Sequence, residues 1–387
     1  MAFAPLAGVR VVDVTTSYAG PTCTQLLAAL GADVVKIEPR SGDEARAWGP
    51  PFAGDLGTLF VAANSGKRSA AIDLRRGTEV VLRLVDRADV FVQSLRPGLA
   101  DELGLGAEAL RARKPELVHC TISSYGRTGP RRDLPGYDPL LQAAGGLISV
   151  TGEPGGDGVR VGVSLIDHAT GMYAAFAILA ALHEGGGRTL DVSLWETALS
   201  FVSYHLIGAI ETGAVPTPQG TAFHAIAPYQ VFPASDGGLM ITAANDGLFR
   251  RLVEAVELPG LADDPRFATN PDRVRNRPAL VEALSARLRE RTRAEWLETL
   301  AAAGVPAAPV QDLGEVAADP QTDAIGILQR LGPYTTLGPA FSADDERPAY
   351  ASPPPALGEH TAEVLSEVGY STEEIEALAE AGVIRLT

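Results

Sequence analysis

A carboxylate at the start of a predicted helix, Asp167, is the side chain in this sequence whose position best fits covalent chemistry. Apolar residues follow it at helical spacing, namely Ala169, Met172, Tyr173, Phe176 and Ala180. The unpaired N–H groups and the positive dipole at a helix N-terminus hold a carboxylate in its charged form, and a charged carboxylate is a nucleophile at neutral pH. An ordinary helix-capping role explains the same position, and the two interpretations are compatible.

A phenol and a second carboxylate, Tyr137 and Asp138, begin the preceding predicted helix after Leu134-Pro135-Gly136. Two carboxylates that lie close together push their pKa values apart, which makes one the nucleophile and the other a proton-holding partner. If Asp138 lies beside Asp167, the two form such a pair. Otherwise Asp138 only initiates its helix and Tyr137 packs nearby, because spacing in sequence does not establish proximity in space.

Other common catalytic patterns do not occur in the sequence. The 6 histidines form neither HExxH nor two histidines spaced with a carboxylate, so we predict no metal site. His168 adjoins Asp167 but lies about 100° further around a helix, a position typical of a surface residue. There is no GxSxG, and no GxGxxG follows a predicted strand, which argues against a serine hydrolase and against a nicotinamide or flavin cofactor.

Composition indicates a globular protein, since 46% of the 387 residues are hydrophobic and 21% are charged. The net charge of -16 argues against binding of nucleic acid or of a membrane surface, although a small anionic ligand needs only a local basic patch. Basic residues do gather near the ends of predicted strands, namely Arg40, Lys67, Arg68, Arg75, Arg76, Arg96, Arg127, Arg131 and Arg132. This clustering favours an anionic, nucleotide-like ligand, and solvated loop charge is the alternative.

Three features favour a soluble protein of the cytoplasm. The two cysteines, Cys23 and Cys120, provide no disulfide framework and fit a reducing compartment. The first residues lack the basic and then apolar regions of a signal peptide. The longest apolar stretch, around residues 171–182, is too short and too mild for a membrane span.

The N-terminal half alternates predicted strands and helices. The strands are 9–15, 34–38, 69–74, 90–93 and 117–123, and the helices between them are 21–30, 78–87 and 107–113. This alternation predicts an α/β fold with a mostly parallel sheet that is covered on both faces. Ligands bind at the carboxyl ends of such strands, so one crevice should be lined by residues 15–19, 74–76, 93–96 and 123–127.

The pattern changes in the second half of the chain. Helices are predicted at 137–147, 167–183 and 196–210, with a strand at 189–194, and prolines and glycines then mark a linker. A hairpin at 231–242, turned at 235–238, is followed by helices at 247–256, 273–289 and 293–303. These elements predict a second, smaller α+β domain. A final helix at 371–381 has acidic residues in its first turn.

Short motifs that run in order over essentially the whole chain resemble those of the class III CoA-transferases, a family that includes formyl-CoA and carnitine CoA-transferases. Besides the helix of Asp167, they are LAGVRVVD from Leu6, AGP from Ala19, GADVVKIE from Gly31, NSGKRS from Asn64, RPG from Arg96, GYDP from Gly136, DVSL from Asp191 and LGEHT from Leu357. No single motif is specific, but the ordered set is. The same superfamily contains the α-methylacyl-CoA racemases.

The resemblance implies a fold of the α/β class, with a Rossmann-like large domain, a smaller α+β domain, and two chains interlocked as a homodimer. It places a large CoA-binding domain at residues 1–200, completed by 325–387, with a linker at 201–228 and the small domain at 229–324. It also implies that Asp167 is the nucleophile, with Tyr137 and Asp138 beside it, and that a loop closes over the site. The implied ligands are an acyl-CoA and a small carboxylic acid, without a separate cofactor.

The resemblance further implies a set of CoA-binding positions. These are Thr16, Tyr18, Ala19, Arg40, Ile72, Arg75, Ser94, Leu95 and Leu103, to which the strand-end basic residues add Arg96 and Arg131. Several positions depart from the formyl-CoA enzyme, which has His and Gln at Thr16 and Tyr18 and a basic residue at Glu102. Pro135 replaces a phosphate-contacting lysine, so Arg131 or Arg132 takes that role, and no glycine-rich lid occurs between residues 214 and 229. Specificity for oxalate or formate is therefore not implied.

Two alternative functions stay open at this point. A racemase of the same superfamily carries His where this chain has Tyr137, and a glycine run where it has His168-Ala169-Thr170-Gly171, so the sequence favours a transferase. Transfer within one dicarboxylate cannot be separated from transfer between two acids. The other alternative is a CoA-binding protein without activity, which Asp167, Tyr137 and Asp138 argue against and Glu102 keeps open.

Overall fold

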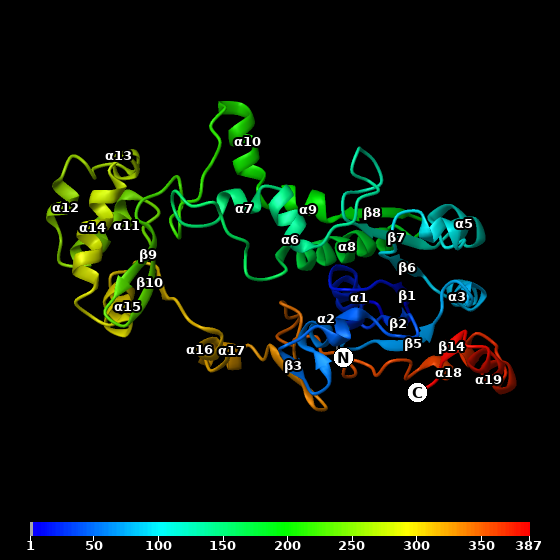
Figure 1. Cartoon of the computed structure of the whole chain (residues 1–387). Helices are drawn as coiled ribbons and strands as arrows, with labels where there is room; N and C mark the ends of the chain where they lie inside the picture. Colours follow the sequence, from blue (N-terminus) through cyan, green and yellow to red (C-terminus); the bar gives the residue numbers. More distant parts are fainter. Residues whose placement is uncertain (1–2) are drawn as a thin grey trace. The chain divides into compact units, whose positions relative to one another are not determined.

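A seven-stranded sheet forms the centre of the larger part of the chain. The computed structural model describes residues 3–387, and the strand order is β14-β5-β2-β1-β6-β7-β8 (Figure 1). The six strands from β5 to β8 in this order are parallel to their neighbours, and the short β14 pairs antiparallel with β5. The strands are β1 (Arg10–Val14), β2 (Asp33–Glu38), β5 (Arg68–Ile72), β6 (Val90–Gln93), β7 (Val118–Ser123), β8 (Thr189–Ser193) and β14 (Ile384–Arg385). The predicted α/β class with a mostly parallel sheet is confirmed.

Both faces of this sheet are apolar, which is why its strands read as continuous runs of Val and Ile. On one face Val11, Val34 and Val90 pack with α1 (Ala19–Ala29) and α8 (Leu165–His183). On the other face Val12, Val35 and Phe91, which follow these residues along the same strands, pack with α3 (Thr78–Val85), α18 (Thr361–Glu367) and α19 (Thr372–Glu380). The remaining elements around the sheet are η1 (Glu44–Ala47), β3 (Phe52–Ala53), β4 (Leu56–Gly57), α2 (Thr58–Asn64), α4 (Leu99–Glu102), α5 (Ala107–Arg113), α6 (Asp138–Ala144), α9 (Leu194–Phe201), α10 (Ser203–Thr212), β12 (Leu328–Leu331) and β13 (Tyr334–Leu337).

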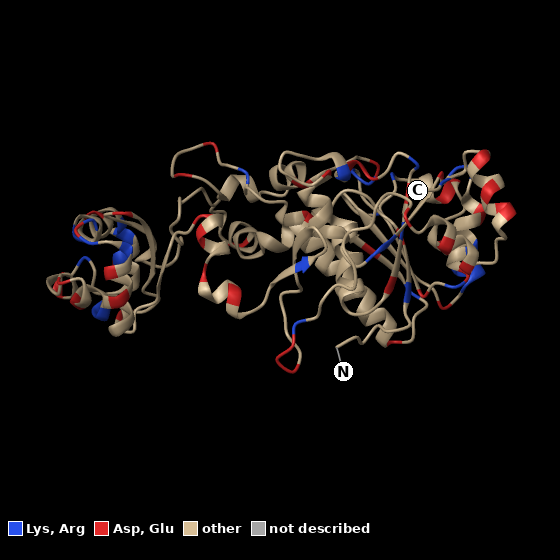
Figure 2. Cartoon of the chain, turned by 90° about the horizontal axis from the view of Figure 1, so that it is seen from below, with Lys and Arg blue, Asp and Glu red and all other residues tan. Residues whose placement is uncertain are grey.

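The C-terminal segment completes this part of the fold. β14 adds to the edge of the sheet beside β5, and Arg68 of β5 forms ion pairs with Glu363 and Glu367 of α18. The larger compact unit accordingly contains residues 1–147, 161–213 and 321–387. Acidic residues outnumber basic ones on its C-terminal helices, and Figure 2 shows Lys and Arg distributed among acidic residues along the chain.

The smaller compact unit contains residues 148–160 and 214–320. Its antiparallel sheet has the order β11-β10-β9, and the turn between β9 and β10 falls at the predicted hairpin turn. Helices pack on this sheet around Phe232, Leu284 and Trp296. The elements are α7 (Leu147–Val150) at the boundary, then β9 (Tyr229–Ala234), β10 (Gly237–Thr242), α11 (Asp246–Ala255), α12 (Gly260–Asp263), α13 (Asn270–Arg275), α14 (Arg277–Leu288), α15 (Arg293–Ala302), β11 (Ala307–Pro309), α16 (Leu313–Ala317) and α17 (Pro320–Ala324), which begins at the boundary.

The boundaries of the two units differ in detail from the predicted domains. The predicted linker, residues 201–228, contains α10, which belongs to the larger unit, and its part from residue 214 onward belongs to the smaller one. The single helix predicted at 273–289 is two helices, α13 and α14, which are interrupted around Asn276. Pro278 follows directly and supplies no backbone N–H, so it suits the first turn of a new helix better than the interior of a long one.

Among the described residues, α8 is the one helix that is long and apolar enough to cross a membrane, by length and composition only. Its packing gives a different reason for that composition. Ile166, Ala174 and Ile178 are fully buried in the core beside α1. A Cβ at Gly171 would lie 2.6 Å from the carbonyl oxygen of Ala19, so glycine is needed at this contact between the two helices. α8 is thus a core helix of the larger unit, and its tight fit against α1 fixes the position of its first turn.

Candidate active site

A cleft of about 520 Å³ lies at the carboxyl ends of β1, β6 and β7. Its walls include the turn after β1, the residues after β6 and β7, and Asp167 at the start of α8. Parallel α/β sheets place ligand sites at this edge. Three of the four segments predicted to line one crevice do line it, whereas residues 74–76 do not.

The predicted site residues divide into two groups. The cleft is lined by Thr16, Ala19, Ser94, Leu95, Arg96, Tyr137 and Asp167. Tyr18, Asp138, Arg40, Ile72, Arg75, Leu103 and Arg131 do not line it. Ile72 is fully buried in the core beneath the sheet, so its side chain offers no surface to a ligand. Arg75 lies near the rim, because Glu102 is 3.9 Å from Arg75 and 3.8 Å from Arg96, which does line the cleft.

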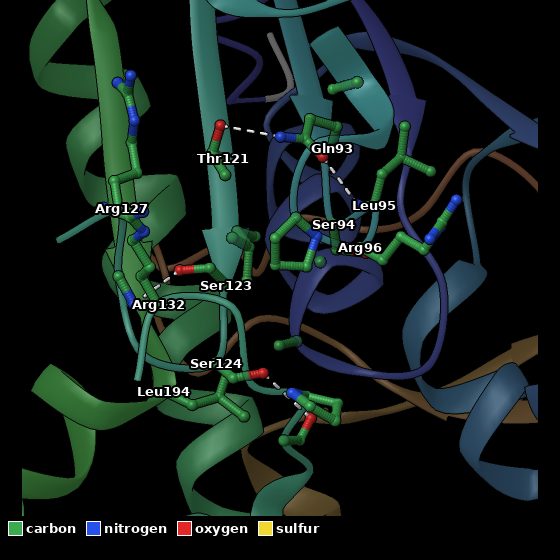
Figure 3. A pocket seen from close by; sticks show the side chains of 18 of the residues that line it. Gln93, Ser94, Leu95, Arg96, Thr121, Ser123, Ser124, Arg127, Arg132 and Leu194 are labelled. Carbon is green, nitrogen blue, oxygen red and sulfur yellow. Dashed lines mark hydrogen bonds between the residues drawn. The ribbon is translucent and has the colours of Figure 1, made fainter. Parts of the chain in front are cut away.

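Arg131 does not line the cleft as predicted, whereas Arg127 and Arg132 of the same loop do. Its guanidinium group stacks over the rings of Trp195, at 5.2 Å, and of Tyr125, at 5.8 Å. Arg127 and Arg132 line the cleft instead, and Figure 3 shows them on one side of it with Arg96 on the other. The basic cluster was visible in the sequence, but which member of an exposed loop faces inward depends on how the loop packs.

Polar contacts at the ends of β6 and β7 shape the floor of the cleft, and they include Thr121, which the sequence did not single out. Nε2 of Gln93 at the end of β6 donates to Oγ1 of Thr121 of β7 at 3.0 Å, and Oε1 of Gln93 accepts from the backbone N–H of Leu95 at 2.8 Å (Figure 3). Ser94 accepts from the backbone N–H of Thr16 through Oγ at 3.2 Å. These contacts join the turn after β1 to the turn after β6, so both walls of the cleft are fixed to one another.

The nucleophile candidate and its neighbouring carboxylate meet at the first turn of α8. Oδ2 of Asp138 accepts from the backbone N–H of Ile166 at 2.8 Å and from that of Asp167 at 3.3 Å. Oδ1 of Asp138 accepts from Gln142 at 2.6 Å. Ser164, at the N-cap position, makes no capping bond of its own. Asp138 therefore accepts the hydrogen bonds of the backbone N–H groups that are free at the start of α8, and its side chain is buried there.

The start of α8 was expected to keep Asp167 ionised, but the structure favours its protonated form. Burial, and secondarily the charge of Asp138, raise the pKa of Asp167 to about 7. The helix N–H groups that were expected to keep Asp167 ionised are bonded to Asp138 instead. Near neutral pH Asp167 thus exists in both forms, and its ionised form is poorly solvated, which suits a carboxylate that must attack.

Replacing Asp138 with Asn is expected to lower the pKa of Asp167 and to move the acidic limb of the pH–rate profile to lower pH. A neighbouring negative charge shifts a carboxyl pKa by roughly one unit or more, while the burial of Asp167 persists in the variant. The measurement is kcat/KM for transfer between pH 5 and 9. Glu184→Gln, at the other end of the same helix, is the control and should leave the limb in place. A limb that stays fixed or moves to higher pH in Asp138→Asn would contradict this coupling.

Two tyrosines lie in the surroundings of Asp167. Tyr137 lines the same cleft and is 56% exposed, so its ring is accessible to a ligand rather than packed in the core. The hydroxyl of Tyr18 lies 3.3 Å from Nδ1 of His168, the surface residue next to Asp167. Burial, and secondarily the charge of Asp167, raise the pKa of Tyr18 against the opposing effect of the nearby Thr22 hydroxyl. Tyr18 therefore reaches the helix of Asp167 and stays protonated at neutral pH.

Within residues 3–387, no group of three or more His, Cys, Asp or Glu side chains is arranged to hold a metal ion. The polar groups that line the cleft are arginines, hydroxyls, an amide and His119, together with three carboxylates, of which Asp167 stands at the start of α8. Arginines bind phosphate and carboxylate groups through paired N–H donors. The arrangement can bind an anionic ligand and present its far end to Asp167.

Comparison with known proteins gives consistent results. Residues 6–361 match the model of CoA-transferase family III. The chain is 38% identical over 397 residues to the succinyl-CoA:glutarate CoA-transferase of Mus musculus, covering 98% of this chain and 90% of the relative. It is 37% identical to the succinate–glutarate CoA-transferase of Agrobacterium fabrum, covering 94% of this chain and 96% of the relative.

Comparison of the fold with solved structures points to the same kind of protein. A crystal structure of a CaiB/BaiF family protein from Brucella suis superposes with a TM-score of 0.85 at 38% identity, covering 94% of this chain and 99% of that one. The Rv3272 protein of Mycobacterium tuberculosis superposes with a TM-score of 0.85 at 30% identity, with the same share of this chain covered and 99% of that one. The predicted resemblance is confirmed: this chain is an enzyme that belongs to CoA-transferase family III.

Proposed function

We propose that this enzyme moves CoA between an acyl-CoA donor and a carboxylic acid acceptor through the carboxylate of Asp167. The observation that carries the proposal is a cleft with arginines on both sides, at the carboxyl ends of parallel strands, that reaches Asp167 at the start of α8. An acyl-CoA has phosphates at one end and a thioester at the other. The arginines suit the phosphates, and the carboxylate suits the thioester.

The proposed reaction runs through two kinds of covalent intermediate. The Asp167 carboxylate attacks the thioester carbonyl, the C–S bond breaks, and CoA thiolate leaves a mixed anhydride on the enzyme. The thiolate then attacks the carbonyl of Asp167, which releases the first acid and leaves an aspartyl-CoA thioester. The acceptor carboxylate attacks that thioester, and the released thiolate takes the acyl group from the second anhydride. Each step exchanges one bond for another, and the carboxylate of Asp167 is regenerated.

The neighbours of Asp167 have different parts in this proposal. Asp138 holds the first turn of α8 and tunes the pKa of the nucleophile, so it acts through Asp167 rather than on the substrate. Tyr137 stands at the cleft, where its hydroxyl can donate to the oxygen that becomes negative during attack. Thr16, Ala19, Ser94 and Leu95 line the path of the CoA chain. The exposed Arg40 and Arg75, with Leu103, remain proposed contacts for the nucleotide end, and CoA itself is a substrate, so no cofactor is needed.

Dicarboxylic acids are the proposed acceptors. The relatives are named for glutarate and succinate in mouse, for oxalate in Acetobacter aceti and for mesaconate in Haloarcula hispanica. All of these acids carry a second carboxylate beyond the one that reacts. Initial-rate measurements with a series of such acids and succinyl-CoA give the preference directly.

A second copy of this chain is the proposed partner. The larger unit exposes large apolar side chains on α8 and α10, and Phe176 and Ile210 are each 71% exposed. Apolar faces of this kind on a folded unit mark an interface. We propose an interlocked homodimer, whose measured mass would be about twice the 40.4 kDa of the chain.

Intact-protein mass spectrometry after mixing with succinyl-CoA tests the proposed chemistry. Hydroxylamine or borohydride is added to trap the activated carboxylate, and the modified residue is mapped by peptide analysis, with Asp167→Ala as the control. The expected result is modification of Asp167 that the variant lacks. Exchange of an α-proton in deuterated water without any modification would support a racemase, and CoA binding with neither signal would support an inactive binding protein.

A further inference from the structure

A strained residue, Ser17, lies in the turn between β1 and α1. Ser17 has a φ of 69°, in the left-handed region that residues other than glycine rarely adopt. Ser17 and its neighbour Thr16 line the cleft, and its other neighbour Tyr18 contacts His168 on α8. The backbone at Ser17 therefore sets the directions in which these two side chains point.

A fully buried ion pair holds the backbone on the N-terminal side of Ser17. Nζ of Lys36 donates to the carbonyl oxygen of Thr15 at 2.8 Å and to Oδ2 of Asp43 at 2.9 Å. Oδ1 of Asp43 accepts from the backbone N–H of Ser17 at 3.2 Å and from that of Ala45 at 3.0 Å. The side chains of Lys36 and Asp43 are both 0% exposed. Lys36 thus binds the peptide group between Thr15 and Thr16, and Asp43 binds the next one, between Thr16 and Ser17.

The position of Asp43 is itself fixed. Its backbone N–H donates to Oε2 of Glu38 at 3.0 Å, and Glu38 forms a bidentate pair with Arg46 at 2.7 and 2.8 Å. Burial alone would raise the pKa of Glu38, but Arg46 and Lys36 lower it, so this carboxylate is charged at neutral pH. The group that binds the Ser17 amide cannot shift without breaking these contacts.

Stability alone does not explain this arrangement. A buried ion pair loses much of its attraction to the cost of leaving water, and apolar residues of similar size often stabilise a fold equally well. Apolar side chains would not bind the Thr15 carbonyl or the Ser17 amide. The two charges make bonds to the strained turn that a merely stabilising contact would not need, which favours a positioning role.

Resting on the proposed function, we propose that Lys36 and Asp43 are positioning residues that hold Ser17 in its left-handed conformation, and so present Thr16 to the CoA chain and Tyr18 to the helix of Asp167. Neither of the two residues lines the cleft. Without the pair, Ser17 relaxes toward negative φ and both neighbours turn away from their positions. CoA binding then weakens, although every residue that touches CoA is still present.

A double-mutant cycle tests this role, because glycine adopts a positive φ at no steric cost. In Asp43→Asn, the Kd for CoA is expected to rise about tenfold, measured by titration calorimetry. In a Ser17→Gly background the same Asp43→Asn change should raise the Kd by less than about threefold, relative to Ser17→Gly itself. The loss of thermal stability caused by Asp43→Asn should be similar in both backgrounds, since glycine restores the turn and not the ion pair.

An equal rise of the Kd in both backgrounds, or no rise in a folded Asp43→Asn protein, would overturn the proposal. If Asp43→Asn does not fold, Lys36→Gln replaces it in both backgrounds, because it removes the other charge of the pair and its side chain does not line the cleft. Its expected effect is again a rise of about tenfold, and an unchanged Kd would overturn the proposal. Binding of CoA is measured without turnover, so wild-type protein that binds CoA but transfers nothing would contradict the proposed function and leave this test intact.

Discussion

Asp167→Asn is expected to abolish CoA transfer and, at neutral or higher pH, to make the protein more stable. Asn has nearly the same shape as Asp but cannot attack a thioester, so both covalent intermediates are lost. Removal of a covalent nucleophile reduces kcat by at least about 10³-fold in enzymes of this kind. The measurement is the steady-state rate of succinyl-CoA-dependent transfer, with calorimetric binding of CoA to show that the cleft is intact. Residual transfer within tenfold of the wild type would exclude Asp167 as the nucleophile.

The expected gain in stability follows from the raised pKa. Burial and Asp138 raise the pKa of Asp167 to about 7, from 3.8 in an unstructured chain. Between pH 4 and 7 the folded protein keeps a proton that the unfolded chain releases, so the free energy of unfolding falls as the pH rises through this range and stays low above it. One pKa unit corresponds to about 1.4 kcal/mol, which puts the penalty on the order of a few kcal/mol at pH 8.

Thermal unfolding of Asp167→Asn at two pH values checks this penalty. Asn does not titrate, so the variant should melt at a higher temperature than the wild type at pH 8, and the difference should disappear near pH 4. Asp133→Asn, which removes an exposed carboxylate from the loop before Tyr137, is the control and should melt like the wild type at both values. A variant that is less stable at pH 8 would mean that Asp167 contributes more to the fold than its burial costs. A destabilised variant would also weaken any conclusion drawn from its loss of activity.

The sheet and the position of Asp167 could be predicted because both follow from local patterns. Runs of Val and Ile between helical segments specify parallel strands that are buried on both faces, and adjacent residues such as Val11 and Val12 do pack on opposite faces. The apolar periodicity after Asp167 specifies α8, and the carboxyl-end rule for α/β sheets specifies the cleft. Each of these inferences needs only a short stretch of chain.

The features that the sequence did not reveal depend on contacts between distant segments. Asp138 caps the helix of Asp167, although 29 residues separate them, and the expected effect of that helix start was reversed as a result. Arg131 was predicted to bind CoA, yet it stacks on Trp195, which lies on α9. Ile72 aligns with a binding position of the family, but its side chain is buried in the core. No local pattern records which loop residue faces inward or which polar group caps a helix.

Lys67→Met is expected to destabilise the fold by about 3–5 kcal/mol, because it leaves a buried carboxylate without its charged partner. Oδ2 of Asp13 accepts from Nζ of Lys67 at 3.2 Å, and both side chains are 0% exposed. Nζ of Lys67 also donates to the carbonyl oxygen of Pro21 at 2.9 Å and to Asn64 at 3.0 Å. Burial would raise the pKa of Asp13, but Lys67 and Lys36 lower it, so this carboxylate stays charged.

Urea unfolding of a second double-mutant cycle measures this cost. Burial lowers the pKa of Lys67 to about 8, against the charge of Asp13, so experiments at pH 7 keep the lysine charged in the wild type. In Asp13→Asn/Lys67→Met both charges are gone, and the double variant should recover most of the stability that Lys67→Met loses. The hydroxyls of Thr15 and Thr24 also donate to Asp13. If Lys67→Met lowers the free energy of unfolding by less than about 1 kcal/mol, these hydroxyls and the nearby Lys36 suffice to stabilise the charge of Asp13. Because Asp13 also accepts from the backbone N–H of Thr15, a large cost would show that the stability of the fold depends on a buried charge that bonds to the start of the turn at Ser17.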